Sequence, residues 1–349
     1  MKRFKIGKKF IGLNDPCFIV AEISANHNGK ISNAIKIIKH ASKIGVNAIK
    51  LQTYTADTIT LNSYKKDFLI SKKSPWQKEK NFWNLYKKGY TPWEWHKKLF
   101  KEAKKNNLEI FSSPFDEKAV DFLEKLGCVA YKIASPEINH IPLLAKVGKT
   151  GKPVILSTGL SRLSDIKLAI STLKKNGSKN IILLKCTTNY PAKINEINLA
   201  TLCDYKKRFN VISGFSDHTK GKIAALTSVA LGAKVLEKHF SLKGKKSLDD
   251  FFSMNHIQFK EMVEEIREVE KAIGNINYNI SQGSKTHFKG RRSIYVSENI
   301  KKGELITKKN IKIVRPNYGL HPKYFNKILG KKVKKNLTAG SRFKLSYIK

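Results

Sequence analysis

Residues 232–242 have the sequence GAKVLEKHFSL, which combines a predicted buried strand with a charged end. It begins as a small-residue turn, continues as an apolar β-run, and then places Glu237, Lys238 and His239 where the hydrophobic run ends. A strand of this kind should be buried, and a buried strand that ends in charge must have those charges satisfied by solvent, by protein partners or by a ligand. The rest of the sequence indicates which of these applies.

Similar runs recur from residue 17 to about residue 240, each followed by a longer segment with helical spacing of apolar residues. There are eight of them: CFIVAEIS (17–24), NAIKLQT (47–53), EIFSSP (109–114), AYKIAS (130–135), PVILST (153–158), IILLKCT (181–187), VISGFSD (211–217) and AKVLEKHF (233–240). Nearly continuous hydrophobicity is typical of strands covered on both faces, so we predict an α/β fold, a (β/α)8 TIM barrel. A doubly wound open sheet is the alternative, but it more often has a Gly-rich phosphate loop after the first strand, where this chain has SANHNG.

Helix start and stop signals occur between these strands. Helices are expected at ISNAIKIIKHASKIG (31–45), TPWEWHKKLFKEAKKNN (91–107), DEKAVDFLEKLG (116–127), SRLSDIKLAISTLKKNG (161–177) and, as the eighth, IQFKEMVEEIREVEKAIG (257–274). Residues 54–90, which contain Trp76 and Trp83, are too long for a plain loop. We expect them to form a lid-like insertion over the barrel mouth.

Three segments are expected in the domain organisation, the first being a catalytic barrel over residues 1–274. Residues 275–292, NINYNISQGSKTHFKGRR, are polar and contain Gly, which is typical of a linker. Residues 293–349 have short alternating strands and the turn signals KKGE and TAGS. A module of this size has a marginal core alone, so we expect it to pack on the barrel or on a partner subunit.

Composition favours a globular protein with a large core, since the chain has 349 residues of which 41% are hydrophobic. The N-terminus lacks the apolar region and cleavage site of a signal peptide, and no stretch approaches about 18 uncharged apolar residues. The four cysteines lie far apart without a CxxC pair, which fits neither a disulfide framework nor a zinc cluster. We therefore expect a cytoplasmic protein without a membrane span.

The chain is strongly basic: it has 68 Lys and Arg residues against 27 Asp and Glu residues, a formal net charge of +41 at pH 7. Such a field attracts nucleic acid without any specific site. However, the excess is almost entirely Lys dispersed along the chain, and no nucleic-acid-reading motif accompanies it. We expect no specific nucleic-acid partner, although the same field favours anionic substrates.

The chemistry of a TIM barrel lies at the C-terminal ends of its strands. The eight runs end, in chain order, in Glu22, Ser24, Asn26 and His27; Lys50 and Gln52; Ser112 and Ser113; Lys132, Ser135 and Glu137; Ser157 and Thr158; Lys185, Thr187 and Asn189; Ser216, Asp217 and His218; and Glu237, Lys238 and His239. Singly, each has a structural explanation as a helix cap, a snorkelling Lys or a satisfied core His. A complete ring of such residues points to a functional site.

The ring supplies point charges and hydroxyl donors, which a phosphate and a carboxylate require. These residues are Lys50, Lys132, Lys185, Ser112, Ser135, Ser157 and Ser216. His218 and His239 end adjacent strands, so their imidazoles can converge on one divalent metal, with Glu22 or Asp250 and waters completing the shell. A site with two histidines keeps open positions, as a catalytic metal must.

Eight motifs in this order resemble the bacterial sialic acid synthase family, which condenses phosphoenolpyruvate with an acetamido sugar. They are EISANHNG, IKLQTYT, FSSPFD, YKIASPEI, STGL, LKCTTNYP, GFSDHT and EKHF, followed by IVRPNYGLHPKY. Within the family, TPWEWHKKLF and GLHPKYF are similar to the pseudaminic acid synthases. The C-terminal module resembles the antifreeze-like (SAF) domain of these enzymes, which reaches over the active site of the other subunit in a domain-swapped homodimer.

The resemblance implies roles for particular residues. Phosphoenolpyruvate is assigned to Lys50, Ser112, Lys132, Ser135, Ser157 and Ser216, and the metal, usually Mn²⁺ with Mg²⁺ or Co²⁺ as alternatives, to His218 and His239. Glu22, Gln52 and Glu137 are expected at the reacting centre as catalytic residues, and Arg315 is expected to bind the sugar in the partner's site. The loop GKKSLDDFFSMN departs from the family's acid-rich form, which leaves the roles of Asp249 and Asp250 open.

The implied reaction is pseudaminic acid synthesis from phosphoenolpyruvate and 2,4-diacetamido-2,4,6-trideoxy-L-altrose. The enol C3 attacks the open-chain aldehyde, water adds at C2 and the adduct loses phosphate. Either Glu22 or Glu137 would handle the proton. N-acetylneuraminate or legionaminate synthesis is the enzymatic alternative. A non-catalytic, basic nucleic-acid-binding protein is the alternative from another class, and it leaves the ring of strand-end residues unexplained.

Overall fold

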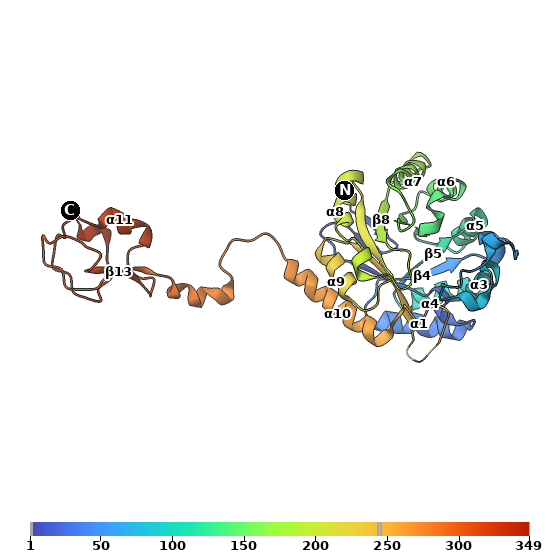
Figure 1. Cartoon of the computed structure of the whole chain (residues 1–349), viewed down its shortest axis with the longest axis horizontal. Helices are drawn as coiled ribbons and strands as arrows, with labels where there is room; N and C mark the ends of the chain where they lie inside the picture. Colours follow the sequence, from blue (N-terminus) through green and yellow to red (C-terminus); the bar gives the residue numbers. More distant parts are fainter. Residues whose placement is uncertain (1–2, 243, 245, 349) are drawn as a thin grey trace. The chain divides into compact units, whose positions relative to one another are not determined.

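The computed structural model describes residues 3–242, 244 and 246–348, and they divide into two compact units, 1–274 and 275–349. Within the described part of the first unit, eight parallel strands form a closed barrel, because β10 pairs with both β3 and β9 (Figure 1). The strands are β3 (Phe18–Glu22), β4 (Ala48–Thr53), β5 (Glu109–Pro114), β6 (Tyr131–Ile133), β7 (Val154–Ser157), β8 (Ile181–Cys186), β9 (Ile212–Asp217) and β10 (Val235–Ser241). The TIM barrel predicted from the eight apolar runs is confirmed.

Helices alternate with these strands around the barrel (Figure 1). They are α1 (Ile31–Lys43), α4 (Trp93–Lys105), α5 (Glu117–Lys125), α6 (Ile141–Lys149), α7 (Leu163–Lys175), α8 (Thr201–Phe209), α9 (Ile223–Ala230) and α10 (His256–Ile273). Polar side chains cap several of them: Asp116 accepts from the backbone N–H of Ala119 at the start of α5, and Asn255 caps α10 in the same way. The apolar faces of these helices and both faces of the strands share one buried core.

An N-terminal hairpin, β1 (Phe4–Ile6) and β2 (Lys9–Ile11), contacts the amino-terminal end of the barrel, where the backbone N–H of Lys8 donates to Glu109 at the start of β5. Ile6 and Ile11 are buried in the barrel core. The hairpin therefore lies at the end opposite the strand-end ring. A short strand, β11 (Met254–Asn255), pairs in parallel with Phe240 and Ser241 at the C-terminal end of β10.

The 54–90 segment contains two short helices, α2 (Ala56–Ile59) and α3 (Phe82–Gly89), with 3₁₀ turns at Lys66–Phe68 and Gln77–Glu79. Asn81 caps α3 by accepting from the backbone N–H of Asn84. Side chains of this segment line a cavity together with residues from the strand ends. The insertion therefore lies at the barrel mouth.

The second unit contains a 3₁₀ segment (Gln282–Gly290), the antiparallel pair β12 (Ser293–Val296) and β13 (Ile311–Val314), and the short helix α11 (Phe325–Ile328). It has its own small core, which includes Ile294, Ile306 and Phe343. Residues 275–281, at the start of the expected linker, are exposed. In the described residues, no helix is both long and apolar enough to cross a membrane.

Candidate active site

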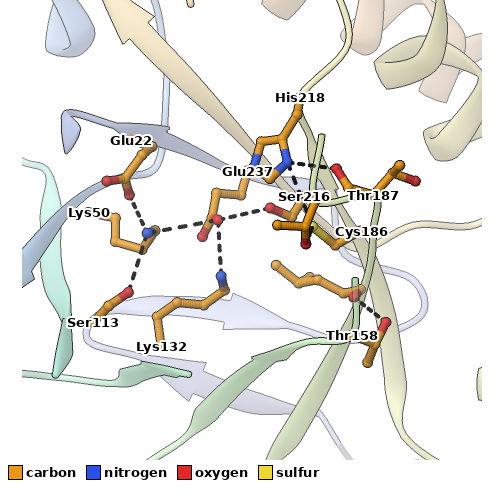
Figure 2. Close-up of polar contacts among 12 residues, drawn as sticks. Glu22, Lys50, Ser113, Lys132, Thr158, Cys186, Thr187, Ser216, His218 and Glu237 are labelled. Carbon is orange, nitrogen blue, oxygen red and sulfur yellow. Dashed lines mark hydrogen bonds and ion pairs between the residues drawn. The ribbon is translucent and has the colours of Figure 1, made fainter. Parts of the chain in front are cut away.

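Four buried charged side chains meet at the carboxyl ends of β3, β4, β6 and β10. Glu22 forms an ion pair with Lys50, and Glu237 Oε1 lies 3.1 Å from Lys132 Nζ and 3.9 Å from Lys50 Nζ. No side chain of the four is more than 4% exposed. Figure 2 shows the Glu237 carboxylate directed between the two ammonium groups. We call Glu22, Lys50, Lys132 and Glu237 the charge cluster.

Two serine hydroxyls complete this arrangement. Ser216 Oγ donates to Glu237 Oε1 at 3.1 Å, and Ser113 Oγ lies 3.4 Å from Lys50 Nζ (Figure 2). Burying four charges is costly unless they are paired, and here each ammonium has a carboxylate partner. An anionic ligand can take the place of such a partner, because lysine ammonium groups bind phosphate as point charges.

Unused polar atoms lie near the charge cluster. Among the described residues, Glu237 Oε2, Glu137 Oε2, Ser157 Oγ and His239 Nδ1 are buried and have no hydrogen-bond partner. Buried polar atoms are almost always hydrogen-bonded in proteins, so each exception calls for an explanation. Hydrogen bonds to a bound ligand would account for these four unpartnered atoms.

Burial and pairing set the pKa values of these acids in opposite directions. Burial raises the pKa of Glu22, although Lys50 opposes it. Burial alone would raise the pKa of Glu237 as well, but the ammonium groups of Lys132 and Lys50 hold it below its usual value. Burial raises the pKa of Glu137 to about 7, opposed first by a hydrogen bond from its own backbone N–H and then by the charges of Lys132 and Lys50. Glu137 is thus poised to give up or accept a proton near neutral pH.

The two adjacent serines of β5 have different surroundings. Ser113 faces Lys50, as described above, whereas the Ser112 hydroxyl lies 2.6 Å from Thr53 Oγ1, which in turn lies 2.8 Å from Nε2 of His96 on α4. Successive side chains of a strand point to opposite faces. The structure therefore does not bring Ser112 to the charge cluster, where it was expected, and places Ser113 there instead.

This difference gives a matched pair of variants. Ser113→Ala is expected to raise the KM for an anionic substrate about tenfold, because a hydroxyl beside the Lys50 ammonium group is lost. Ser112→Ala is expected to lower the free energy of unfolding by about 1 kcal/mol without changing that KM, because it removes the hydrogen bond to Thr53 of β4, which in turn bonds His96 on α4. Steady-state kinetics and thermal unfolding of both variants check this, and a larger KM effect for Ser112→Ala would contradict the assignment.

Lys185 also lies apart from the charge cluster. Its Nζ donates to the backbone carbonyl of Cys186 at 2.9 Å, and Cys186, the next residue of β8, directs its sulfur toward His218. Because side chains alternate along a strand, Lys185 points to the other face. Ser135 remains near the site, where its hydroxyl accepts from the backbone N–H of Leu160 at 2.6 Å.

His218 and His239 lie side by side, with ring centroids 5.4 Å apart. His218 Nδ1 is 3.0 Å from the carbonyl oxygen of Thr187, so it donates there and its Nε2 stays available (Figure 2). Burial, followed by the charge of His218, holds the pKa of His239 well below its usual value. A neutral imidazole is the form that binds metals. Burial lowers the pKa of His218, but Cys186 and the Thr187 carbonyl raise it overall. His239 is therefore the ring already in the metal-binding form, and the pair would suit one divalent cation once His218 loses its proton.

In the described residues, no group of three His, Cys, Asp or Glu side chains could hold a metal ion. The structure does not bring Glu22 or Asp250 to the two histidines, since Glu22 is paired with Lys50. Any ion held by His218 and His239 would therefore take its remaining ligands from water or substrate.

A cavity of about 570 Å³ opens above the strand ends. Gln52, Glu137 and His239 line it, as does Asp249, which also accepts from Ser24 Oγ and from the backbone N–H of Ala25. The other walls are largely apolar: Tyr54, Ile59, Trp76, Phe82, Leu85, Tyr86, Phe115, Tyr190 and Phe252. Asp249, rather than Asp250, is thus the acid of its loop that faces the cavity.

Arg315 belongs to the second unit. It lines a separate cavity of about 630 Å³ in that unit, together with His287, Arg291, Arg292 and His321. These cationic side chains make the cavity suited to an anionic or strongly polar group.

Several of these residues had no assigned role in the sequence interpretation. Glu237 was recognised at a strand end but not assigned, although its alternation with His239 was a usable signal, because both must face the same side of β10. Ser113 could not be preferred over Ser112, since a pattern of period two does not fix which phase faces inward. Tyr190 and Phe252 follow no pattern that distinguishes a cavity wall from core.

The chain matches the NeuB family over residues 37–278 and the SAF domain over residues 291–345. It is 42% identical to a pseudaminic acid synthase of Campylobacter jejuni over 330 residues, which cover 94% of this chain and 96% of the relative. An N,N'-diacetyllegionaminic acid synthase of the same species is 37% identical over 91% of this chain and 96% of its own. The crystal structure of the spore coat polysaccharide biosynthesis protein SpsE of Bacillus subtilis superposes with a TM-score of 0.66 at 30% identity, covering 100% of this chain and 99% of that one. This chain therefore belongs to the NeuB family, with a TIM barrel followed by a SAF domain.

Proposed function

We propose that this NeuB-family synthase condenses phosphoenolpyruvate with 2,4-diacetamido-2,4,6-trideoxy-L-altrose to give pseudaminic acid and phosphate. The observation that carries the proposal is the charge cluster beneath a largely apolar cavity of about 570 Å³. Buried ammonium groups suit a small dianion, and the adjacent cavity suits a second substrate with apolar substituents. The similarity to pseudaminic acid synthases supports the same assignment.

The lining of the cavity bears on the choice of sugar. A 2,4-diacetamido-6-deoxy sugar carries three methyl groups, whereas a sugar with a C6 hydroxyl needs a hydrogen-bond partner there. The 54–90 segment offers Ile59, Phe82 and Leu85 to the cavity. An apolar wall stabilises methyl groups and leaves a buried hydroxyl unsatisfied. This favours a 6-deoxy substrate over the precursor of N-acetylneuraminic acid.

Phosphoenolpyruvate is assigned to the floor of the site. Lys50 and Lys132 hold its phosphate and carboxylate, and hydroxyls of Ser113, Ser157 and Ser216 orient the oxygens. Glu237, between the two ammonium groups, holds both of them in place before the substrate enters. Because these groups are already in place, little reorganisation is needed as charge moves toward the departing phosphate.

His218 and His239 would hold the divalent cation, which we take to be Mn²⁺, with Mg²⁺ or Co²⁺ as alternatives. When bound, such an ion supplies Lewis acidity toward the sugar aldehyde and a lowered pKa for water. The unpartnered Nδ1 of His239 and the neutral state of its ring fit this role.

Glu137 is the residue we assign to proton transfer. It lines the cavity, and burial raises the pKa of its carboxyl to about 7, so it can protonate the aldehyde oxygen as the new carbon–carbon bond forms. Glu22 is committed to Lys50 and is the weaker candidate. Gln52 lies on the cavity wall and is assigned to substrate positioning.

The assignment predicts a pH dependence. A general acid must be protonated, and Glu137 is protonated below its pKa of about 7. The kcat/KM, which reports the pKa values of the free enzyme, is therefore expected to be level at lower pH and to fall as pH rises through about 7. Glu137→Gln should lower kcat about 100-fold and remove that limb of the profile. A Glu137→Gln profile that keeps the limb would show that another group produces it.

Arg315 is proposed to complete the active site of the partner subunit in a domain-swapped homodimer. Its fixed fork of donors can hold an acetamido carbonyl or sugar hydroxyls. Arg315→Ala should raise the sugar KM far more than the KM for phosphoenolpyruvate. Mixing Arg315→Ala with His239→Ala under subunit exchange should restore about half of the turnover of one subunit, because one site per mixed dimer is intact. No recovery after proven exchange would contradict the swap.

The test of the proposed reaction is release of phosphate from phosphoenolpyruvate with this sugar, in the presence of Mn²⁺ and after treatment with a chelator. The proposal expects phosphate release that needs both the sugar and the metal. Steep, salt-dependent affinity for DNA or RNA without phosphate release would instead favour the nucleic-acid-binding alternative.

A further inference from the structure

Another buried ion pair, separate from the charge cluster, lies behind the two histidines and takes no part in the chemistry described above. Lys238 Nζ is 2.7 Å from Asp217 Oδ2, and the two side chains are 1% and 0% exposed. Lys238 Nζ also donates to the carbonyl oxygen of Thr219 at 2.7 Å. Asp217 Oδ1 accepts from both the backbone N–H and the hydroxyl of Thr219, at 2.8 and 2.7 Å. We call Asp217, Thr219 and Lys238 the clamp.

The clamp joins the last residue of β9 to the middle of the neighbouring strand β10. Lys238 on β10 is the register partner of Asp217 on β9. Lys238 directly precedes His239, and Asp217 directly precedes His218. Because side chains alternate along a strand, Glu237 and His239 lie on one face of β10, and Lys238 lies on the other. The three consecutive ionisable residues therefore serve different surroundings: Glu237 and His239 face the site, whereas Lys238 faces away from it.

A buried ion pair is a poor way to gain stability alone, because removing two charges from water costs about as much as their attraction returns. What it does provide is geometry, since only one arrangement of the two strands satisfies both charges and the Thr219 groups. That arrangement fixes the backbone from which both imidazoles project. It also fixes the turn after β9, in which Thr219 directly follows His218.

We propose that Asp217 and Lys238 are positioning residues that hold His218 and His239 at the separation required to bind one divalent cation. The proposal rests on the metal site of the proposed function. Groups that orient metal ligands from outside the coordination shell typically change metal affinity 10- to 100-fold when they are removed. The clamp is expected to act through metal affinity and coordination geometry, without touching substrate.

The test uses the full-length protein and the metal alone. The double variant Asp217→Asn/Lys238→Met removes both charges together, so that no unpaired buried charge remains. Its Kd for Mn²⁺, measured by isothermal titration calorimetry, is expected to rise at least tenfold, and the visible absorption of bound Co²⁺, which reports coordination geometry, is expected to shift. A correctly folded double variant with a Kd within twofold of the wild type and an unchanged Co²⁺ spectrum would overturn the proposal.

A matched control separates positioning from general stability. Arg267 Nη1 and Glu270 Oε2 form a 2.9 Å ion pair, and Arg267 also donates to the carbonyl of Cys17, just before β3 at the opposite end of the barrel. Arg267→Met/Glu270→Gln is expected to lower the unfolding temperature and leave the Mn²⁺ Kd within twofold of the wild type. An equal loss of affinity in this control would show that the clamp acts only through stability.

Thr219→Val provides a second route if the double variant does not fold. It keeps both charges and removes one hydrogen bond to Asp217, so a rise of about threefold in the Mn²⁺ Kd is expected, and an unchanged Kd would overturn the proposal. Wild-type protein that binds neither Mn²⁺ nor Co²⁺ would remove the metal site of the proposed function and the clamp's role together. One equivalent bound by wild type, lost in His239→Ala and retained in the double variant, would remove the clamp's role alone.

Discussion

Replacing Lys50 with methionine is expected to lower kcat/KM for phosphoenolpyruvate about 1000-fold, equivalent to about 4 kcal/mol of transition-state stabilisation. The substitution removes an ammonium group that pairs with Glu22 and lies 3.9 Å from Glu237 Oε1. Two buried carboxylates would then face the incoming phosphate with only Lys132 to balance them. Steady-state kinetics measure the effect, and thermal unfolding reports the cost of the unpaired acid, about 3 to 5 kcal/mol for a broken buried pair.

Lys185→Met is the matched control, because it removes the same functional group from a neighbouring part of the barrel. Lys185 donates to the backbone carbonyl of Cys186 and points away from the charge cluster. Its substitution is expected to change kcat/KM by less than about threefold. A loss as large as that of Lys50→Met would mean that Lys185 reaches the phosphate after all, as the sequence had led us to expect.

Replacing His239 with alanine is expected to abolish metal-dependent turnover, lowering kcat at least about 1000-fold. The imidazole is neutral, lines the cavity and has an Nδ1 without a hydrogen-bond partner in the described structure, so its removal takes away the proposed metal ligand together with an edge-to-face contact with Phe252. The fold should remain, since no hydrogen bond is lost at Nδ1. Turnover with saturating Mn²⁺ and circular dichroism check both parts.

His256→Ala is the control for this prediction. The His256 Nδ1 is also buried without a hydrogen-bond partner among the described residues, but its ring packs on His40, between the outer helices α10 and α1. Its substitution should leave kcat and the Mn²⁺ requirement unchanged. Activity of His239→Ala in chelator-treated protein equal to that of the wild type would contradict the metal assignment.

The barrel could be predicted from sequence because its strands are continuous apolar runs. CFIVAEIS predicted a strand, and β3 spans Phe18–Glu22 within it; ISNAIKIIKHASKIG predicted a helix, and α1 spans Ile31–Lys43. The N-terminal hairpin was not predicted, since MKRFKIGKKFIGL mixes apolar residues with many lysines. In the structure its two isoleucines, Ile6 and Ile11, are buried in the barrel core.

The types of residue at the site could be predicted from the sequence, but the side of the strand that each one faces could not. Every strand end carried polar residues, and the structure brings Glu22, Lys50, Lys132 and Ser216 together from four strands. Which of two adjacent residues faces inward depends on the phase of the strand in the closed barrel, which one strand's sequence does not contain. The pair Ser112 and Ser113 shows this, because both are buried and only their partners differ.

The sequence predicted the insertion that carries part of the aromatic cavity wall, but not which of its side chains line the cavity. Residues 54–90 were expected to form a lid at the barrel mouth, and the structure places Trp76 against the cavity, where its Nε1 donates to the carbonyl of Leu248. Trp83, in contrast, donates to Asp57 within the insertion and does not line the cavity. Composition alone could not distinguish these two tryptophans, since the contacts of Trp76 come from residues distant in sequence.

A competition among sugars tests the proposed substrate specificity of the synthase. The protein is supplied with phosphoenolpyruvate, Mn²⁺ and equal concentrations of 2,4-diacetamido-2,4,6-trideoxy-L-altrose and the sugars that yield legionaminic and N-acetylneuraminic acids, and early products are resolved by chromatography and identified by mass spectrometry. Product ratios then equal the ratios of kcat/KM. We expect pseudaminic acid to exceed each of the other products at least tenfold. Predominant formation of legionaminic or N-acetylneuraminic acid, or no condensation product, would contradict it.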